Sequence, residues 1–196
     1  MEQPVKQNGD GISVDVQCLA KNLAANEAYI QRHYPEEIFI AHISQLKTMS
    51  KYAKGLIIPD NVKVAESRLP INAEQRRILR KELRQAGVLA RFGYSVFLTP
   101  EYGAYKIRVT DAVVNGVPFE FRNITGQARK IEIRFGKAKE KGYDVNVFLN
   151  IDANIEIKEA KRRISLVLAH HLDYTGKIII SFKGKTVLFL DTGVFR

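Results

Sequence analysis

The sequence of 196 residues is poor in cysteine, in acidic residues and in long apolar runs. Its one cysteine, Cys18, excludes an internal disulfide and a cysteine-based zinc cluster. No apolar run approaches about 18 residues, so neither a transmembrane helix nor a membrane partner is expected. The start of the chain is polar and lacks an apolar segment, so a secretory signal peptide is not expected either.

Acidic residues are outnumbered by basic ones. The chain has 31 Lys and Arg against 21 Asp and Glu, which gives a formal net charge of +10. This excess predicts a polyanionic partner, most simply a nucleic acid. Hydrophobic residues make up 45% of the sequence, enough for a sizeable core, and the length fits one domain with an appendage or two small domains.

The first third of the chain has helical patterns and few strand signals. Apolar residues recur at three-to-four spacing over 19–33, and a second helix is predicted over 36–49. Residues 1–19 are expected to form a flexible lead, and residues 54–73, which contain several Pro and Asn residues, a connector. We therefore expect a helical N-terminal segment with a flexible lead over 1–66.

Residues 67–196 alternate helix and strand signals in the order α-β-β-β-α-β, followed by α-β-β. Asn115-Gly116 favours a two-residue hairpin turn, and Lys183-Gly184 favours a second turn. This order predicts an α/β (α+β) domain with a mixed sheet and flanking helices. The elements are expected as helices over 73–91, 127–141 and 155–171 and as strands over 92–98, 105–114, 117–123, 144–151, 177–182 and 185–190.

The predicted Asn115-Gly116 turn places Asp111 opposite Glu120, with Cβ atoms about 4.5–5.5 Å apart. Two facing carboxylates repel, so water, a shared proton, a basic neighbour or a divalent cation must offset the repulsion. Arg122 points to the same side of the strand as Glu120 and can pair with a carboxylate or a phosphate. The pattern is compatible with two interpretations, a metal site or a polar surface neutralised by Arg122.

The element order, with Asp111 on the second strand and Glu120-Phe121-Arg122 on the third, resembles the PD-(D/E)-x-K nuclease superfamily. More narrowly, the stretch TDAVVNGVPFEFRNITGQARKIEIRFGKAKEKGYDVNVFLNI, residues 110–151, is similar to the tRNA-nuclease domains of contact-dependent growth inhibition toxins. The resemblance covers roughly residues 70–190. It implies a metal-dependent endonuclease toxin domain that cleaves tRNA or other RNA.

The resemblance also implies a ligand set for a divalent metal ion, Mg²⁺ or Zn²⁺. Asp111 and Glu120 would hold the cation, and Glu82, from the helix before the first strand, would complete the site. Glu82 lies at the edge of the apolar stripe of its helix and can turn toward the sheet, or it can pair with a neighbouring arginine. Glu101 is a rival ligand. The cation would activate water and polarise the phosphoryl oxygen.

The usual lysine after the last acid is Arg122 in this chain, which departs from the family pattern. In the toxin subgroup this lysine moves to the following helix, so the resemblance assigns the role to Lys139, or else to Lys137. That amine would stabilise the charge that develops in the transition state.

Basic residues gather on two predicted helices. Arg77, Arg80 and Arg84 form one stripe by the three-to-four rule and suit a nucleic-acid backbone. Lys130, on the later helix, and Arg122 are further candidates for phosphate contact. A nuclease and a non-enzymatic nucleic-acid-binding protein would share such stripes.

Two alternatives stay open. A metal-independent toxin RNase of the barnase or colicin type would use His170 or His171 as general acid or base. A non-enzymatic basic module of a phage or mobile element would bind nucleic acid without cleaving it. If the toxin resemblance holds, a cognate acidic immunity protein is expected, and the domain would act in the cytoplasm after delivery within a larger secreted or phage-borne protein.

Overall fold

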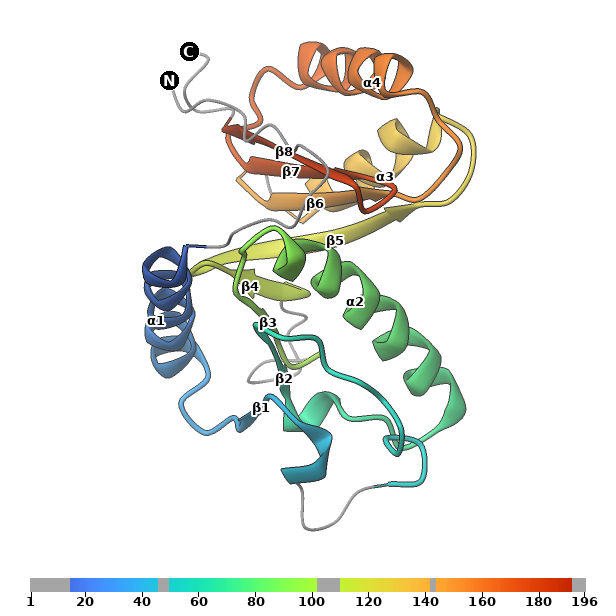
Figure 1. Ribbon diagram of the computed structural model, residues 1–196. Helices are drawn as coiled ribbons and strands as arrows, with labels where there is room; N and C mark the ends of the chain where they lie inside the picture. The colour runs from blue at the N-terminus through green and yellow to red at the C-terminus, as the bar shows by residue number, and fades with distance from the viewer. Residues whose placement is uncertain (1–14, 46–49, 102–109, 142–143, 192–196) are drawn as a thin grey trace. The chain divides into compact units, whose positions relative to one another are not determined.

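The computed structural model describes residues 15–45, 50–101, 110–141 and 144–191 (Figure 1). The chain forms two compact units, one spanning Ile12–Pro118 and one containing Phe119–Arg196. They are named the N-terminal unit and the C-terminal unit below. The division falls after Pro118, whereas the sequence-based boundary near residue 66 lies within the N-terminal unit.

The two long helices of the N-terminal unit begin at polar caps. Helix α1, Val16–His33, starts after Asp15, whose carboxylate accepts a hydrogen bond from the backbone N–H of Gln17. Helix α2, Ala73–Arg91, starts after Asn72, whose side chain accepts from the N–H of Gln75. Both caps satisfy backbone donors that a helix leaves unpaired in its first turn. The helices predicted over 19–33 and 73–91 are therefore confirmed.

The prediction of a helix over 36–49 is wrong. The chain instead forms strand β1, Phe39–Ile40, and a 3-10 turn η1, Ile43–Gln45, while residues 46–49 lie outside the described residues. Strand pairing overrides the local pattern here, because Phe39 and Ile40 pair with Ala65 and Val64 of a neighbouring strand. The Phe39 ring also packs against the Phe97 ring, with centroids 5.5 Å apart.

The connector predicted over 54–73 is also wrong in part, because it contains strand β2, Val62–Ala65, and the 3-10 helix η2, Glu66–Arg68. Strand β2 pairs antiparallel with β1 and parallel with β3, Val96–Leu98. Strand β3 pairs antiparallel with β4, Ala112–Val114. Both are shorter than the strands predicted over 92–98 and 105–114, and residues 102–109 lie outside the described residues.

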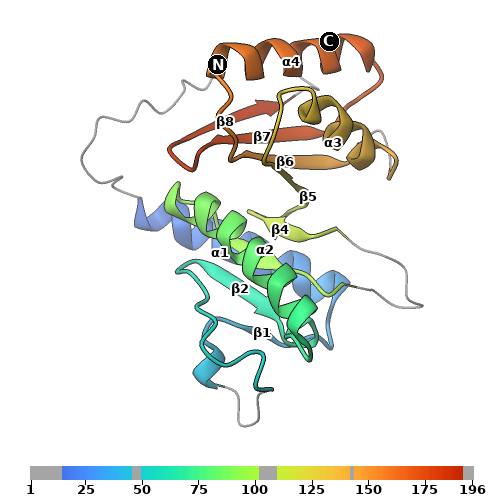
Figure 2. The same cartoon turned by 90° about the vertical axis from the view of Figure 1, so that its right-hand side faces the viewer.

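Helices α1 and α2 lie on opposite sides of these strands, as Figures 1 and 2 show from two directions. On one side, Ile30 of α1 packs with Phe97 and Val113 in a small apolar cluster. On the other, α2 buries Leu79 and Leu83. The apolar stripe predicted for this helix is thus its core-facing side.

The Asn115-Gly116 turn forms as predicted. Both residues have positive φ, 50° and 81°, which is the conformation of a type I′ hairpin turn. Helix α1 packs directly on this turn. The buried Asn26 amide donates to the Ser95 hydroxyl over 3.0 Å, and its carbonyl oxygen accepts from the Gly116 N–H over 2.6 Å. The network fixes the turn from one side.

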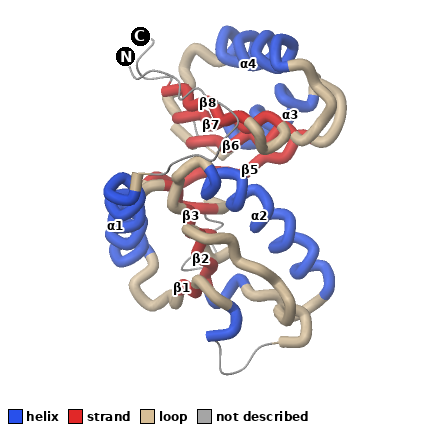
Figure 3. Tube along the Cα trace, viewed as in Figure 1, coloured by secondary structure: helices blue, strands red, loops and turns tan. Residues whose placement is uncertain are grey.

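The C-terminal unit alternates strand and helix along the chain (Figure 3). Strand β5, Val117–Ile124, pairs parallel with β6, Asn146–Ile151, which pairs parallel with β7, Lys177–Phe182. Strand β8, Thr186–Asp191, closes the hairpin with β7. Lys183 and Gly184 turn this hairpin with φ of 48° and 64°, as the sequence predicts.

Helices α3, Lys130–Lys139, and α4, Ile157–His170, cover one face of these strands. The core joins side chains from both helices and from three strands, among them Ile131, Phe135, Val147, Leu149, Ile164, Val167, Ile178 and Ile180. The predicted mixed α+β architecture with flanking helices is confirmed. The segment over 1–66 is not all helical as predicted, because it contains β1 and β2. Among the described residues, no helix has both the length and the apolar character needed to span a bilayer.

The close approach of α1 to Gly116 predicts a specific sensitivity to substitution. A Cβ at Gly116 would lie 3.0 Å from the Cβ of Ala25, in addition to its unfavourable φ of +81°. Gly55 has a similar φ of +74° but nothing within 4 Å, so Gly55→Ala isolates the backbone cost of about 1–2 kcal/mol. Gly116→Ala should lower the free energy of unfolding by about 1–3 kcal/mol more than Gly55→Ala does.

Urea denaturation of both variants and the wild type measures this difference. Equal losses in the two variants would show that α1 yields to the added methyl group.

Candidate functional site

A pocket of about 150 Å³ lies within the N-terminal unit, between α2, the 3-10 helix η2 and the ends of β3 and β4. The residues that α2 contributes to the pocket are spaced so that they share one face of the helix, because residues three and four positions apart lie on the same side. Three carboxylate residues that are distant in sequence, Glu82, Glu101 and Asp111, line this pocket. The remaining lining residues are Ser67, Arg68, Leu69, Gln75, Ile78, Leu79 and Pro100. Glu82 and Asp111, two of the predicted site residues, thus line the same pocket, and their role there stays a prediction.

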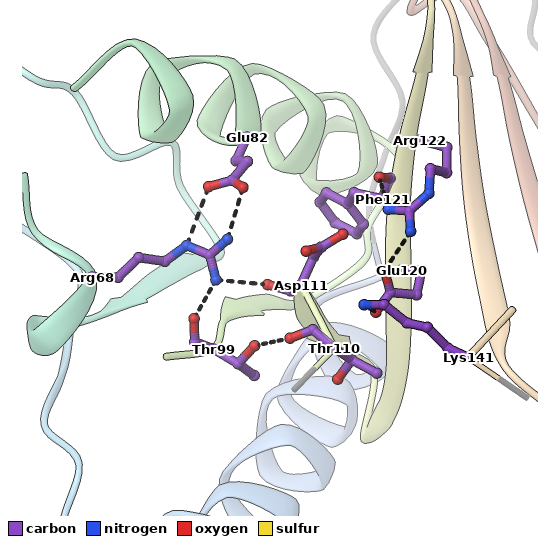
Figure 4. Close-up of polar contacts among 9 residues, drawn as sticks. All are labelled: Arg68, Glu82, Thr99, Thr110, Asp111, Glu120, Phe121, Arg122 and Lys141. Carbon is purple, nitrogen blue, oxygen red and sulfur yellow. Dashed lines mark hydrogen bonds and ion pairs between the residues drawn. The ribbon is translucent and has the colours of Figure 1, made fainter. Parts of the chain in front are cut away.

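Arg68 and Glu82 form a two-pronged ion pair in the wall of the pocket (Figure 4). Arg68 donates from Nε to Glu82 Oε2 over 3.1 Å and from Nη2 to Oε1 over 2.7 Å. Both side chains are largely buried, with exposed fractions of 9% and 14%. Bidentate pairs of this kind are among the stronger charged contacts in proteins because both hydrogen bonds are charge-assisted.

The third arm of Arg68 reaches the strand ends. Its Nη1 donates to the carbonyl oxygen of Thr99, just after β3, and to that of Asp111, just before β4, the latter over 3.4 Å. The Thr99 hydroxyl in turn donates to the carbonyl of Thr110. Arg68 therefore connects α2 to both strand ends and fixes the backbone of Asp111.

Burial raises the pKa of Glu82 above its usual value, and the neighbouring charges of Asp111 and Glu101 raise it further. The Arg68 guanidinium opposes this shift and favours the ionised form. A raised pKa brings the titration of a buried carboxyl closer to neutral pH, where the group can both accept and release a proton. Such carboxyls are common at catalytic sites.

Metal binding by Glu82, Asp111 and Glu120 stays a prediction. Both carboxylate oxygens of Glu82 accept hydrogen bonds from Arg68. Among the described residues, no three His, Cys, Asp or Glu side chains are grouped to hold a metal ion. Asp111 and Glu101 line the same pocket and supply oxygen ligands of the kind that hard cations prefer. Glu82 as placed does not fit a cation, because a cationic side chain already occupies it.

Glu120 belongs to the C-terminal unit, so its predicted pairing with Asp111 joins the two units and stays a prediction. Within its unit, Glu120 lies beside Val147 in the β5–β6 register, and Val147 is part of the core under α3 and α4. The side chain therefore faces the helices and is 0% exposed. Two cations neutralise it: Lys141 Nζ contacts Oε1, and Arg122 Nη2 lies 2.9 Å from Oε2 (Figure 4).

Arg122 thus pairs with Glu120, as one of the two open interpretations expected. Its Nη1 also donates to the carbonyl of Phe121 over 2.8 Å. Glu120 Oε2 has no well-aligned hydrogen bond among the described residues, so its contact with Arg122 is an ion pair of poor hydrogen-bond geometry. A buried carboxylate held in this way depends on its cations for stability.

The lysine that contacts Glu120 is Lys141, two residues beyond the end of α3 at Lys139. The role that the resemblance assigns to Lys139 stays a prediction. The Lys139 amine instead lies 2.8 Å from His171 Nδ1 and 3.1 Å from the Asp173 carboxylate. These contacts join the ends of α3 and α4.

The Lys139 contact also bears on the RNase alternative. Because an ammonium group only donates, the Lys139 contact engages the Nδ1 lone pair of His171. His170, the last residue of α4, is exposed. The RNase alternative would therefore use His170 or the Nε2 atom of His171.

The predicted stripe on α2 is exposed but lies away from the pocket. Arg77, Arg80 and Arg84 are all exposed, and Arg77 pairs with Glu74 over 2.6 Å. Arg80 and Arg84 stand two residues to either side of Glu82, hence about 160° from it around the helix. The stripe and the pocket therefore open on different sides of α2.

Lys130, the other predicted phosphate contact, is exposed at the start of α3 in the C-terminal unit. Its side chain folds over Gly126, where a Cβ would lie 2.8 Å from the amine. The neighbouring helices carry further cations in ion pairs: Arg163 of α4 contacts Glu132 of α3 over 2.9 Å and Glu159 over 2.8 Å.

Comparison with known proteins yields one partial likeness. No protein-family model and no curated protein matches the chain. A solved structure, the CdiA-CT/CdiI toxin and immunity complex from Burkholderia pseudomallei, is similar, with 24% sequence identity and a TM-score of 0.48. The match covers 61% of this chain and 89% of that chain. At this level the likeness carries no argument about function, which is therefore argued from the side chains.

The Arg68–Glu82 pair predicts a pH-dependent stability. In Arg68→Met, Glu82 keeps its buried charge without a partner, so the free energy of unfolding at pH 7 should fall by about 3–5 kcal/mol. The pKa of Glu82 is raised in the folded state, so protonation of Glu82 stabilises the folded protein. The cost of burying the ionised carboxylate is therefore present at neutral pH and becomes smaller as the pH falls. The deficit of the variant should accordingly be smaller at pH 5.

Urea denaturation at the two pH values measures this effect. Adding Glu82→Leu to Arg68→Met removes the unpaired charge and serves as the control, since it should recover part of the loss and remove most of the pH dependence. A deficit that is the same at pH 7 and pH 5 would contradict the assignment.

Proposed function

We propose that this chain is a nuclease that hydrolyses phosphodiester bonds in RNA, with its acidic site in the pocket of the N-terminal unit. The observation that supports this most directly is the gathering of Glu82, Glu101 and Asp111 around Arg68. The net charge of +10 and the exposed arginines of α2 supply attraction for a polyanion.

Each residue of the pocket has a distinct role in this proposal. Asp111 accepts a proton from the attacking water as the water oxygen bonds to phosphorus. The bond from phosphorus to the leaving ribose oxygen breaks, and that oxygen takes up a proton from bulk water. Arg68 is a positioning residue, because it holds the backbone of Asp111 through a hydrogen bond to its carbonyl oxygen. Glu82 holds Arg68 in place through both carboxylate oxygens.

We also propose that the hydrolysis depends on a divalent metal ion. When bound, Mg²⁺ or Zn²⁺ would supply Lewis-acid stabilisation of the phosphoryl oxygen. Asp111, with Glu101, offers carboxylate oxygens for it in the pocket. Glu82 and Glu120 would not hold the cation as they stand, because both are already paired with cationic side chains.

The preference for tRNA, the toxin role and a cognate acidic immunity protein follow from the sequence resemblance of residues 110–151. A basic protein that cleaves RNA in its own cell needs an inhibitor, and an acidic one would be steered by charge. Each of these three proposals involves a partner molecule, so each is tested separately from hydrolysis itself.

Asp111→Asn should abolish cleavage and leave the fold intact. Loss of a general base costs about 10²- to 10⁴-fold in rate. Asp60→Asn makes the same chemical change at an exposed residue outside the pocket and should retain full activity. The measurement incubates each purified protein with total RNA and with plasmid DNA, with Mg²⁺, with Zn²⁺ and with EDTA.

An Asp111→Asn variant that cleaves like the wild type would sink the catalytic assignment. Activity that survives EDTA would remove the metal from the proposal and leave acid–base hydrolysis. Salt-dependent binding without cleavage by the wild type would support a non-enzymatic binding module instead.

The position of the α2 stripe predicts separate effects on binding and on chemistry. Replacing Arg77, Arg80 and Arg84 together with alanine should weaken RNA binding at every sequence and flatten its salt dependence, because phosphate contacts release counterions. The rate at saturating RNA should stay unchanged, because the stripe opens away from the pocket. Replacing the exposed Lys21, Lys51 and Lys54 makes the same change in charge and is the matched control. Equal losses in both triple variants would mean that net charge alone controls affinity.

A further inference from the structure

The C-terminal unit contains a second cavity, of about 360 Å³, at the carboxyl ends of β6 and β7. Ile151 ends β6 and Phe182 ends β7, and both contribute to its lining. The start of α4 and the β7–β8 turn complete the walls. The other lining residues are Ala153, Asn154, Ile155, Glu156, Ile157, Lys183, Lys185 and Thr186. Carboxyl ends of parallel strands are a common location for ligands in α/β sheets.

The interior of this cavity is apolar. Ile151, Ala153 and Phe182 are 1%, 7% and 5% exposed and form buried parts of its lining. Ile155 adds a partly buried side chain, and Ile157, the first residue of α4, is 48% exposed. A concave surface of aliphatic and aromatic side chains suits a planar, weakly polar group.

Two lysines stand at the edge of the cavity on a well-fixed turn. The Lys183 N–H donates to the Ile151 carbonyl over 2.8 Å, and the Lys185 N–H donates to the Phe182 carbonyl over 2.9 Å. The Lys183 amine also donates to the Asn154 side chain over 2.8 Å. Glu156 is the one carboxylate in the lining, so the two ammonium groups leave an excess of positive charge.

The combination of these features narrows the class of ligand. A free phosphate would make no use of the apolar interior, and a purely apolar ligand would make no use of the lysines. A nucleotide within a single strand has both parts, a planar base and flanking phosphates. Proteins that bind single-stranded nucleic acid use this pairing of apolar or aromatic surface with cations.

We propose that this cavity receives one unstacked base of a single-stranded nucleic acid, with the flanking phosphates on Lys183 and Lys185. The proposal rests on the proposed function only in that the partner is a nucleic acid. It adds a strand-binding site in the C-terminal unit, separate from the residues that would carry the chemistry.

The test compares a fluorescein-labelled cytidine decamer with an abasic decamer of the same length and charge, in EDTA and low salt, by fluorescence anisotropy. Wild-type protein should bind the cytidine decamer about tenfold more tightly, which is the effect of losing one stacked base. Thr186→Trp places a large side chain at an exposed lining position and should remove this preference. Thr186→Val keeps the shape of the residue and should retain it.

Variants that remove the positive charge of Lys183 and Lys185 test their role in binding phosphates. Lys183→Gln with Lys185→Gln should weaken binding of both decamers about equally and lower the salt dependence. Lys51→Gln with Lys54→Gln removes the same charge in the N-terminal unit and should have a smaller effect. Thermal melting checks that each variant folds. If Thr186→Trp does not fold, Ile157→Ser, at a half-exposed position, should also reduce the preference for the base-bearing strand.

Equal wild-type affinity for the two decamers would overturn this inference, as would an unchanged preference in the folded Thr186→Trp or Ile157→Ser variant. If the protein cleaves RNA but shows no such preference, the cavity proposal fails and the nuclease proposal stands. If it neither binds a decamer nor cleaves RNA, both fail.

Discussion

The buried ion pair between Arg68 and Glu82 is the constraint on which the N-terminal unit depends most. A single guanidinium joins α2 to the ends of β3 and β4 through a carboxylate and two backbone carbonyls. Neither partner can be removed alone without leaving a buried charge or unpaired donors. The same contact places Asp111 in the pocket, so the stability of the unit and the geometry of its candidate site have one cause.

Carboxylates in both units are matched by cations from the same chain. Glu82 faces Arg68, and Glu120 faces Lys141 and Arg122. This matching explains how a basic protein tolerates buried acids, while Asp111 and Glu101 add two further carboxylates to the lining of the pocket. Part of the negative charge in the pocket is therefore balanced by Arg68.

The parts of the fold that could be predicted from sequence are those set by local chemistry. Asn115, Gly116 and Gly184 adopt positive φ because Asn and Gly do so more easily than other residues, and Asn72 caps its helix through its own side chain. Strands β1 and β2 were missed because tertiary pairing stabilises them. Arg68 was missed because it follows a stretch without period, and Lys141 because it lies beyond the end of α3.

The parallel pairing of β2 with β3 bears on where this chain can be shortened. Strand β3 has β2 on one side and β4 on the other. A polypeptide beginning at residue 67 would keep Arg68 and α2 but expose a row of backbone donors and acceptors along β3, which is a template for aggregation. It would also lose Asn26, the partner of the Ser95 hydroxyl and the Gly116 N–H. The described residues between 15 and 66 are thus part of the folding unit that contains the pocket, and not a detachable tether.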